Sequence, residues 1–413
     1  MRKLVALSAA ALAALVTGCG GSSGGAANLN WYIFPEPSGS FAAAAKQCSA
    51  ASGGRYNIVL NQLPSDSDSQ RTQLVRRLAA KDSGIDIIGM DVNWTSEFAE
   101  AGWIKPWTGA NKAAVTRGVL AGPIATATWK NTLYGAPLNS NTQLLWYRKD
   151  LVPTPPATWA QMIQEATALA KQGKPHLIEV QGRQYEGLTV WFNSLVESAG
   201  GRILSGPSTV AIGPAAALAA AVMHNVANSP GADPGLSNAQ EDQGRLGFEK
   251  GDAAFEVNYP FVYPSALADT PKLAKVMGWA NYPAVVAGRP ARVTIGGENL
   301  AVSSFSQHPA AAFAAITCLV NAQHQTVDAV KGGLPPTLSA LFDSPALAKA
   351  YPFHALIKQA LQNPAIRPQT PAYSDISLAI QKGLSPPNAI DPSTIVKTLR
   401  SQIKAALSSG ALL

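Results

Sequence analysis

The stretch FEKGDAAFEVNYPFVY, residues 248–263, indicates how this chain folds. Its first residues are typical of a helix end, which a glycine terminates, and residues 253–257 form an apolar run that predicts a buried strand. Such a strand delivers Asn258 and Tyr259 to its C-terminal end, the edge at which open α/β sheets bind ligands. An amide and a tyrosine ring suit a sugar, although the aromatic residues here can equally belong to the core.

The overall composition indicates a large folded protein. Its 413 residues exceed the ~250–300 at which one hydrophobic core stops growing, so at least two lobes are expected. The chain is 47% hydrophobic and 14% charged, which argues against disorder. Leaving out Arg2 and Lys3, in a segment expected to be removed, lowers the formal charge from +7 to +5. Because no stretch interleaves clustered basic and aromatic residues, no nucleic-acid partner is expected.

The N-terminus carries a targeting pattern. Arg2 and Lys3 precede a 13-residue apolar run, residues 4–16, which is shorter than the ~20 residues that span a bilayer. The sequence VTGC that follows resembles the lipobox of bacterial lipoproteins, in which the signal peptide is cut before a lipid-modified cysteine. We therefore expect a signal peptide over residues 1–18, a lipidated Cys19 with a flexible linker over residues 19–27, and an anchor on the extracytoplasmic face of the cell membrane. An ordinary signal peptide is the alternative.

Export also bears on the two other cysteines. An oxidising compartment lets disulfides persist, and Cys48 and Cys318 form an even pair. Our hypothesis is that they are bridged. Two buried free thiols are the alternative.

Strand and helix patterns alternate after the linker. Apolar runs predict strands at residues 29–34, 56–63 and 85–90, and the runs between them predict helices at residues 41–51 and 67–81. This βαβαβ order implies a parallel sheet.

Asp91 directly follows the third strand, so it is expected at the ligand-binding edge. It can shape a turn there or accept hydrogen bonds from a ligand hydroxyl. Farther along, residues 133–148, 288–293 and 332–336 are interpreted as three crossings between lobes.

Catalytic signatures are missing from the sequence. It contains no G-x-S-x-G, H-E-x-x-H, Walker A or C-x-x-C motif, and its five histidines have no metal-ligand spacing. We therefore expect a protein that is not an enzyme and that needs no metal and no cofactor. A glycosidase stays open as an alternative, because two carboxylates brought together by folding leave no short motif.

Several longer motifs carry a resemblance to a known family. The runs YGAPLNSNTQLLWYR (134–148), FEKGDAAFEVNYPFVY and VTIGGENLAVS (293–303), together with the lipobox, resemble the solute-binding lipoproteins of carbohydrate ABC importers, the extracellular solute-binding protein family 1. The similarity covers essentially the whole mature chain. The runs MDVNWTSEFAEAGW (90–103) and GLTVWFNSL (187–195) resemble the mycobacterial trehalose-binding lipoproteins in particular.

This resemblance implies a periplasmic-binding-protein-like α/β fold, in which two lobes are joined by a three-crossing hinge and the ligand lies in the cleft between them. Lobe 1 is expected to comprise residues 28–136 and 290–334, and lobe 2 residues 137–289 and 335–413. The implied function is to bind trehalose or a related α-linked disaccharide, as a monomer, and to deliver it to the transmembrane subunits of an ABC permease. Maltose or sucrose is the alternative ligand.

The resemblance also implies a set of ligand contacts. They are Asp91, Asn141, Glu241, Tyr259 and Arg367, to which Asn258 and Gly297 are added as candidates. The relatives carry Trp where this chain has Tyr259, and they carry a segment after PFVY that this chain lacks. Both departures bear on which sugar is preferred.

Overall fold

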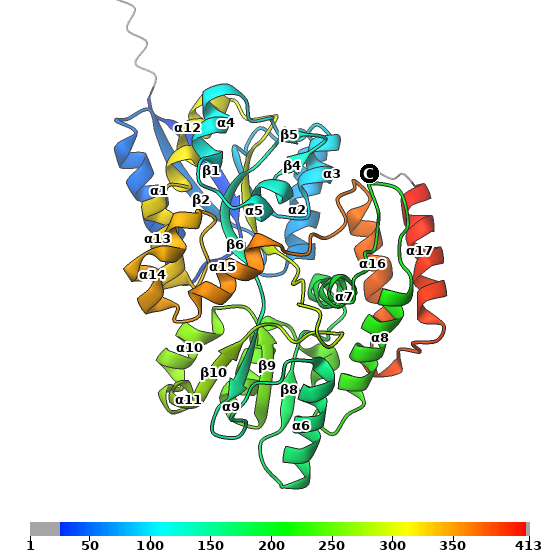
Figure 1. Cartoon of the computed structure of the whole chain (residues 1–413). Helices are drawn as coiled ribbons and strands as arrows, with labels where there is room; N and C mark the ends of the chain where they lie inside the picture. Colours follow the sequence, from blue (N-terminus) through cyan, green and yellow to red (C-terminus); the bar gives the residue numbers. More distant parts are fainter. Residues whose placement is uncertain (1–24, 410–413) are drawn as a thin grey trace, which may run out of the picture.

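The first lobe is built on a five-stranded sheet in the computed structural model, which describes residues 25–409 (Figure 1). The sheet has the order β2-β1-β3-β11-β6, with β1 (Ala27–Ile33), β2 (Tyr56–Gln62), β3 (Ile87–Asp91), β6 (Ala136–Asn141) and β11 (Gly296–Val302). As the βαβαβ pattern predicts, β1 pairs in parallel with β2 and β3, whereas β11 is antiparallel to β3 and β6. The predicted signal peptide, residues 1–18, and Cys19 lie outside the described residues.

Helices cover both faces of this sheet. Successive strand residues point to opposite faces, so Ile87 packs under one helical layer and Ile88 under the other. The first layer consists of α1 (Ser40–Ala51), α12 (Pro309–Leu319) and α13 (Ala322–Gly332), and the second of α2 (Ser67–Ala79) and α3 (Thr95–Glu100). Shorter elements complete the lobe: α4 (Gly109–Thr116), α5 (Ala121–Thr126), β4 (Thr128–Trp129) and β5 (Thr132–Leu133). Within residues 25–409, no helix is both long and apolar enough to cross a membrane.

The second lobe is built on a four-stranded sheet with the order β10-β7-β9-β8. Its strands are β7 (Leu144–Arg148), β8 (Leu177–Glu179), β9 (Ala253–Asn258) and β10 (Met277–Ala280). As predicted, a helix precedes β9 and ends at a glycine: α9 (Glu241–Lys250) is followed by Gly251, whose φ of +98° lies in the left-handed region that favours glycine. The central strand β9 is buried along its whole length and ends at Asn258, so Tyr259 directly follows the strand.

Helices also flank the second sheet. One face is covered by α6 (Trp159–Lys171), α7 (Glu186–Ser198), α8 (Pro214–Ala227), α16 (Tyr373–Leu384) and α17 (Ile395–Ser409). The other face is covered by α9, α10 (Val262–Asp269) and α11 (Pro271–Val276). Helix α14 (Pro345–Ala350) contacts α13, and α15 (His354–Gln362) contacts α5 and β6, so both helices lie with the first lobe. Short 3₁₀ helices lie at Leu236–Asn238, Ser339–Asp343 and Pro387–Ala389.

The chain passes between the lobes at three places. The first is the two-residue link of Thr142 and Gln143 between β6 and β7, the second is residues 281–295 between β10 and β11, and the third is residues 363–372 between α15 and α16. Thr294 and Ala365 form a parallel bridge, so the last two passages run side by side.

These positions differ from the expected lobe boundaries in two ways. The expected boundary after residue 136 falls at the start of β6, whose residues pair with β11, so the first lobe extends to Asn141. Residues 332–336, interpreted above as a crossing, stay beside β6, because the Pro335 carbonyl accepts a hydrogen bond from Ser140. The helices α14 and α15 that follow lie where the lobes meet: α15 contacts β6, while Phe353 packs on Trp146 of the second sheet.

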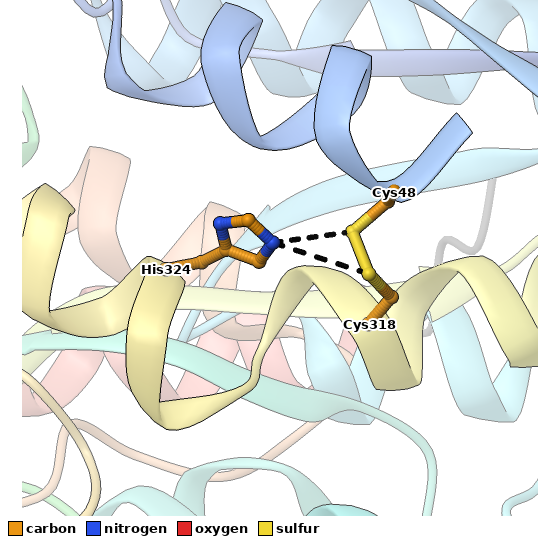
Figure 2. Close-up of side chains that lie close together, drawn as sticks. All are labelled: Cys48, Cys318 and His324. Atoms are coloured by element: carbon orange, nitrogen blue, oxygen red, sulfur yellow. Dashed lines mark hydrogen bonds between the residues drawn. A yellow bond between two sulfur atoms is a disulfide. The ribbon is translucent and has the colours of Figure 1, made fainter. Parts of the chain in front are cut away.

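A disulfide between Cys48 and Cys318 fastens α1 to α12, as the sequence predicted, with the two Cα atoms 5.8 Å apart. Figure 2 shows His324 beside it, with its Nε2 atom 3.4 Å from the sulfur of Cys48. Burial lowers the pKa of His324. Although two cysteines and a histidine are common zinc ligands, the sulfurs here are bonded to each other and offer no thiolate.

Candidate functional site

A cavity of about 620 Å³ lies between the lobes, at the edge where β3 and β9 end. Six of the seven predicted ligand-binding residues line it: Asp91, Asn141, Glu241, Tyr259, Gly297 and Arg367. They come from β3, β6, β11, α9, the end of β9 and the loop between α15 and α16. Asn258 does not line the cavity. The fold therefore brings together residues that are up to 276 positions apart in the sequence.

Arg367 joins the two lobes across one end of this cavity. Its Nη2 atom donates a 2.8 Å hydrogen bond to Asp91 of the first lobe, and its Nη1 atom donates a 2.7 Å hydrogen bond to Glu186 of the second lobe. The Arg367 side chain is only 4% exposed. A buried guanidinium that bridges two carboxylates is held firmly, because each partner neutralises part of its charge and satisfies part of its donor set.

Glu186 is a site residue that the sequence reasoning missed. It is the first residue of α7, and its carboxylate accepts hydrogen bonds from Arg367, Tyr373 and Ser377, the last at 2.5 Å. Burial raises its pKa, and the Arg367 charge opposes that shift. An acidic residue at a helix start usually signals only a favourable helix dipole, so the one available clue was its place directly before the GLTVWFNSL motif.

Asn258 holds neighbouring residues of the site in place without lining the cavity itself. The residue is fully buried, and its Nδ2 atom donates to the Glu241 carbonyl at 2.8 Å and to the Glu256 carboxyl at 2.7 Å. Its Oδ1 atom accepts the backbone N–H of Tyr259 at 2.8 Å. These three bonds tie the start of α9 to the end of β9. Asn258 therefore positions Tyr259 and Glu241 instead of facing the cavity itself.

Glu241 and Tyr185 are a second pair of polar residues that line the cavity. Tyr185 directly precedes α7 and was not predicted. Burial raises the pKa of Glu241, and the neighbouring Tyr185 hydroxyl opposes the shift. Burial also raises the pKa of Tyr185 well above its ordinary value, so its hydroxyl stays protonated and can donate a hydrogen bond.

The start of β11 forms the opposite wall. Gly297 has a φ of +119°, and a Cβ atom there would lie 2.4 Å from the Asn139 carbonyl oxygen. Only glycine fits this close approach of two strands. The next residue, Glu298, also lines the cavity and was not predicted as a contact. The paired glycines of the VTIGGENLAVS motif were the sequence signal for this bend.

Four residues that line the cavity keep a buried polar atom without a hydrogen-bond partner among residues 25–409. These atoms are Arg367 Nε, Tyr185 Oη, Asn139 Nδ2 and Glu298 Oε2. The aromatic rings of Phe34, Tyr259 and Phe261 also border the cavity. Donors, acceptors and apolar ring faces in one cavity suit a polyhydroxylated ligand, which offers hydroxyl groups and C–H faces together.

Comparison with known proteins gives one family match. A model of the bacterial extracellular solute-binding proteins matches residues 37–326. A probable ABC transporter-binding protein of Deinococcus radiodurans is 27% identical over 365 residues, which are 84% of this chain and 86% of that protein.

Solved structures share the fold. Maltose-bound MalE3 of T. maritima has a TM-score of 0.84 and 23% identity, and the match covers 92% of this chain and all of that one. The GacH receptor of Streptomyces glaucescens, solved without ligand and with acarbose, has a TM-score of 0.81 and 19% identity, with coverage of 93% and 99%. Both likenesses support the two-lobed, periplasmic-binding-protein-like architecture.

Proposed function

This chain belongs to the bacterial extracellular solute-binding proteins, and from that premise we propose that it binds a disaccharide for an ABC importer and delivers it to the membrane permease. The observation that carries the proposal is the cavity between the lobes, where polar atoms without protein partners lie on residues of both lobes. A ligand that contacts both lobes favours the closed arrangement in proportion to the contacts it makes only there.

A carbohydrate is the ligand class that this lining favours. Carboxylates and a guanidinium match pairs of hydroxyl groups, and Tyr259 offers a ring face for C–H groups. Two proteins with this fold are described with maltose and with acarbose, which supports the same class. The cavity volume of about 620 Å³ lies within the range of small-molecule sites.

Within this class we propose trehalose or a closely related α-linked disaccharide. The support comes from Asp91, Asn141, Glu241, Tyr259 and Arg367, which match the motifs shared with trehalose-binding lipoproteins and all line the cavity. Maltose or sucrose is the second candidate, because Tyr259 replaces the Trp of those relatives and offers a smaller ring with an added hydroxyl. We further propose that the protein acts as a monomer, tethered to the outer face of the membrane through Cys19, and that it is not an enzyme.

Calorimetric titration of the purified protein tests this function. Trehalose is expected to bind, more tightly than maltose or sucrose, and glucose is expected to bind weakly because one ring cannot reach both lobes. Absence of heat with all three disaccharides would contradict the proposal. Prolonged incubation with trehalose, followed by an assay for free glucose, tests the glycosidase alternative; accumulation of glucose would favour it.

A further inference from the structure

The carboxyl group of Glu298 lies at the cavity wall outside the Asp91–Arg367–Glu186 contacts. Glu298 lines the cavity and is only 9% exposed, and its Oε2 atom is buried without a hydrogen-bond partner among residues 25–409. A buried polar atom without a partner costs ~1–3 kcal/mol. Such a cost at the wall of a cavity is offset when a ligand supplies the missing partner.

The backbone of β11 is shaped to place this side chain. The register between β11 and β6 shifts between Glu298 and Asn299, which marks a β-bulge. Directly before the bulge, Gly297 adopts the left-handed region, and the Glu298 N–H donates a 3.1 Å hydrogen bond to the side chain of Asn139. Bulges next to binding sites re-aim a side chain, so the placement of Glu298 is a built feature of the strand.

The surroundings of Glu298 decide its charge state. It lies directly opposite Asp91 in the pairing of β11 with β3, where two like charges repel. Arg367 is the cation that faces both, but its hydrogen bonds go to Asp91 and Glu186. Burial and the Asp91 charge together raise the pKa of Glu298 well above its ordinary value, and Arg367 only partly opposes the shift. Glu298 therefore keeps its proton to a higher pH than an exposed carboxyl does.

We propose that Glu298 is a further ligand-contacting residue, a neutral carboxylic acid that donates a hydrogen bond to an oxygen of the bound sugar. This inference rests on the proposed function and adds a specificity-determining group to it. A protonated carboxyl has one O–H donor, whereas Asp91 beside it accepts hydrogen bonds from Arg367 and Ser67. Glu298 and Asp91 thus form a donor and acceptor pair on one wall.

That pair fits a particular ligand chemistry. A hydroxyl group can donate to Asp91, but a ring oxygen or glycosidic oxygen has no hydrogen and can only accept. The Glu298 proton supplies the donor that such an acetal oxygen requires. The geometry therefore favours a disaccharide that presents an acetal oxygen to Glu298 and a hydroxyl to Asp91.

Two substitutions of Glu298 distinguish a role as a hydrogen-bond donor from a role as a negative charge. Glu298→Gln keeps a donor of similar shape, and Glu298→Ala removes it. With trehalose at neutral pH, we expect Glu298→Gln to stay within about threefold of the wild-type affinity and Glu298→Ala to lose about tenfold or more. Glu165→Gln is the matched control. Its carboxyl also has a buried unpaired oxygen, but it lies on α6 and does not line the cavity, so its affinity should equal that of the wild type.

The pH dependence gives a second readout. Wild-type affinity should fall as the pH rises through the raised pKa of Glu298, and this part of the profile should be lost in Glu298→Gln. Glu241 also has a raised pKa and faces the cavity, but it is present in both proteins, so the difference between the profiles isolates Glu298. Thermal unfolding without ligand checks folding. Both variants should melt near the wild-type temperature, because neither loses a hydrogen bond to the Glu298 Oε2 atom.

Two results would overturn the inference alone: wild-type affinity in Glu298→Ala, or a loss in Glu298→Gln as large as in Glu298→Ala. The first shows that Glu298 does not contact the ligand, and the second shows that it acts as a carboxylate. A wild-type protein that binds no disaccharide would overturn the proposed function, and this inference with it.

Discussion

Asp91 and Arg367, which are 276 positions apart in the sequence, form a 2.8 Å ion pair at the wall of the cavity between the lobes. The same guanidinium holds Glu186 at 2.7 Å, so a single side chain connects the end of β3 to the start of α7. This arrangement has a consequence for substitution. A cation that can make only one of the two contacts leaves a buried carboxylate unpaired.

Replacing Arg367 with lysine should therefore weaken both folding and binding. Lysine keeps the charge but lacks the planar fork that reaches Asp91 and Glu186 together. Leaving one buried partner unpaired costs ~2–5 kcal/mol, and we expect sugar affinity to fall at least about tenfold. Urea unfolding and calorimetry measure the two effects. The control is Arg148→Lys, whose partner Asp150 is exposed and which should change stability by less than ~1 kcal/mol. Unchanged affinity in Arg367→Lys would show that the ligand binds elsewhere.

The aromatic residues Tyr259 and Tyr263 should respond to substitution in opposite ways. Tyr259 borders the cavity, so Tyr259→Ala should lower sugar affinity by about tenfold or more with little loss of stability. Tyr263 packs against Trp146, Trp279 and Phe353 and does not line the cavity. Tyr263→Ala should cost ~1–3 kcal/mol of stability, because the ring is partly buried, and should leave affinity nearly unchanged. If Tyr259→Ala instead lost stability and kept its affinity, Tyr259 would be a core residue.

Removing the disulfide should destabilise the first lobe without altering the cavity. The bond joins residues 270 positions apart, and the chain-entropy model assigns so long a loop a stabilisation of up to ~5 kcal/mol. The double variant Cys48→Ala, Cys318→Ala should unfold at lower urea concentration, while trehalose affinity stays within about twofold because neither cysteine lines the cavity. Reduction of the wild type should reproduce the loss. A wild type and a double variant with equal unfolding midpoints would argue against a bridge in solution.

A buried acid in the second lobe should make stability depend on pH. Burial raises the pKa of Glu256 from 4.5 to about 8, so the folded protein keeps this proton over a range in which the unfolded chain releases it. Its contribution to stability is thus fully present below about pH 4.5 and falls, by at most about 1.4 kcal/mol per pH unit, as the pH rises toward 8. Glu179 lies opposite in β8, and its pKa of about 9 acts in the same direction.

Urea unfolding between pH 5 and pH 9 tests this dependence. Glu256→Gln should unfold with a shallower pH slope than the wild type, because the amide cannot ionise. The exposed Asp343→Asn should keep the wild-type slope. Parallel slopes for wild type and Glu256→Gln would contradict the raised pKa.

The sequence predicted the elements better than their boundaries. Apolar runs correctly predicted β1, β2, β3 and β9, because a short apolar run between turn residues is typical of a buried strand. Pro137 was expected to lie in the first crossing between the lobes, residues 133–148. It is instead part of β6, which tolerates proline because it lies at the edge of its sheet. That single misreading shifted the expected lobe boundary.

The residues of the candidate site were also predicted only in part. The motif resemblance named five residues that the fold brings to one cavity, and the added candidate Gly297 lines it too. Glu186 and Glu298 were missed because their roles depend on partners far away in the chain. Asn258 was named as a candidate contact, yet its side chain points away from the cavity toward Glu241 and Glu256. Its position directly before Tyr259 correctly predicted that Asn258 lies at the end of β9. The direction of a side chain at a strand end depends on the neighbouring strand and helix, which no local pattern records.

The central position of β11 in the first sheet has a consequence for the order of folding. This strand lies between β3 and β6, but it is synthesised after the whole second sheet, which is continuous from β7 to β10. The first lobe therefore cannot complete its hydrogen bonding until the second lobe's strands have been made, the reverse of the usual N-terminal-first order. In chains arrested on the ribosome after β10, we expect the amides of β9 to be more protected from hydrogen exchange than those of β3, and equal protection would contradict this. A chain whose leading half waits for its trailing half stays unfolded longer, which is the state that an export machinery can thread.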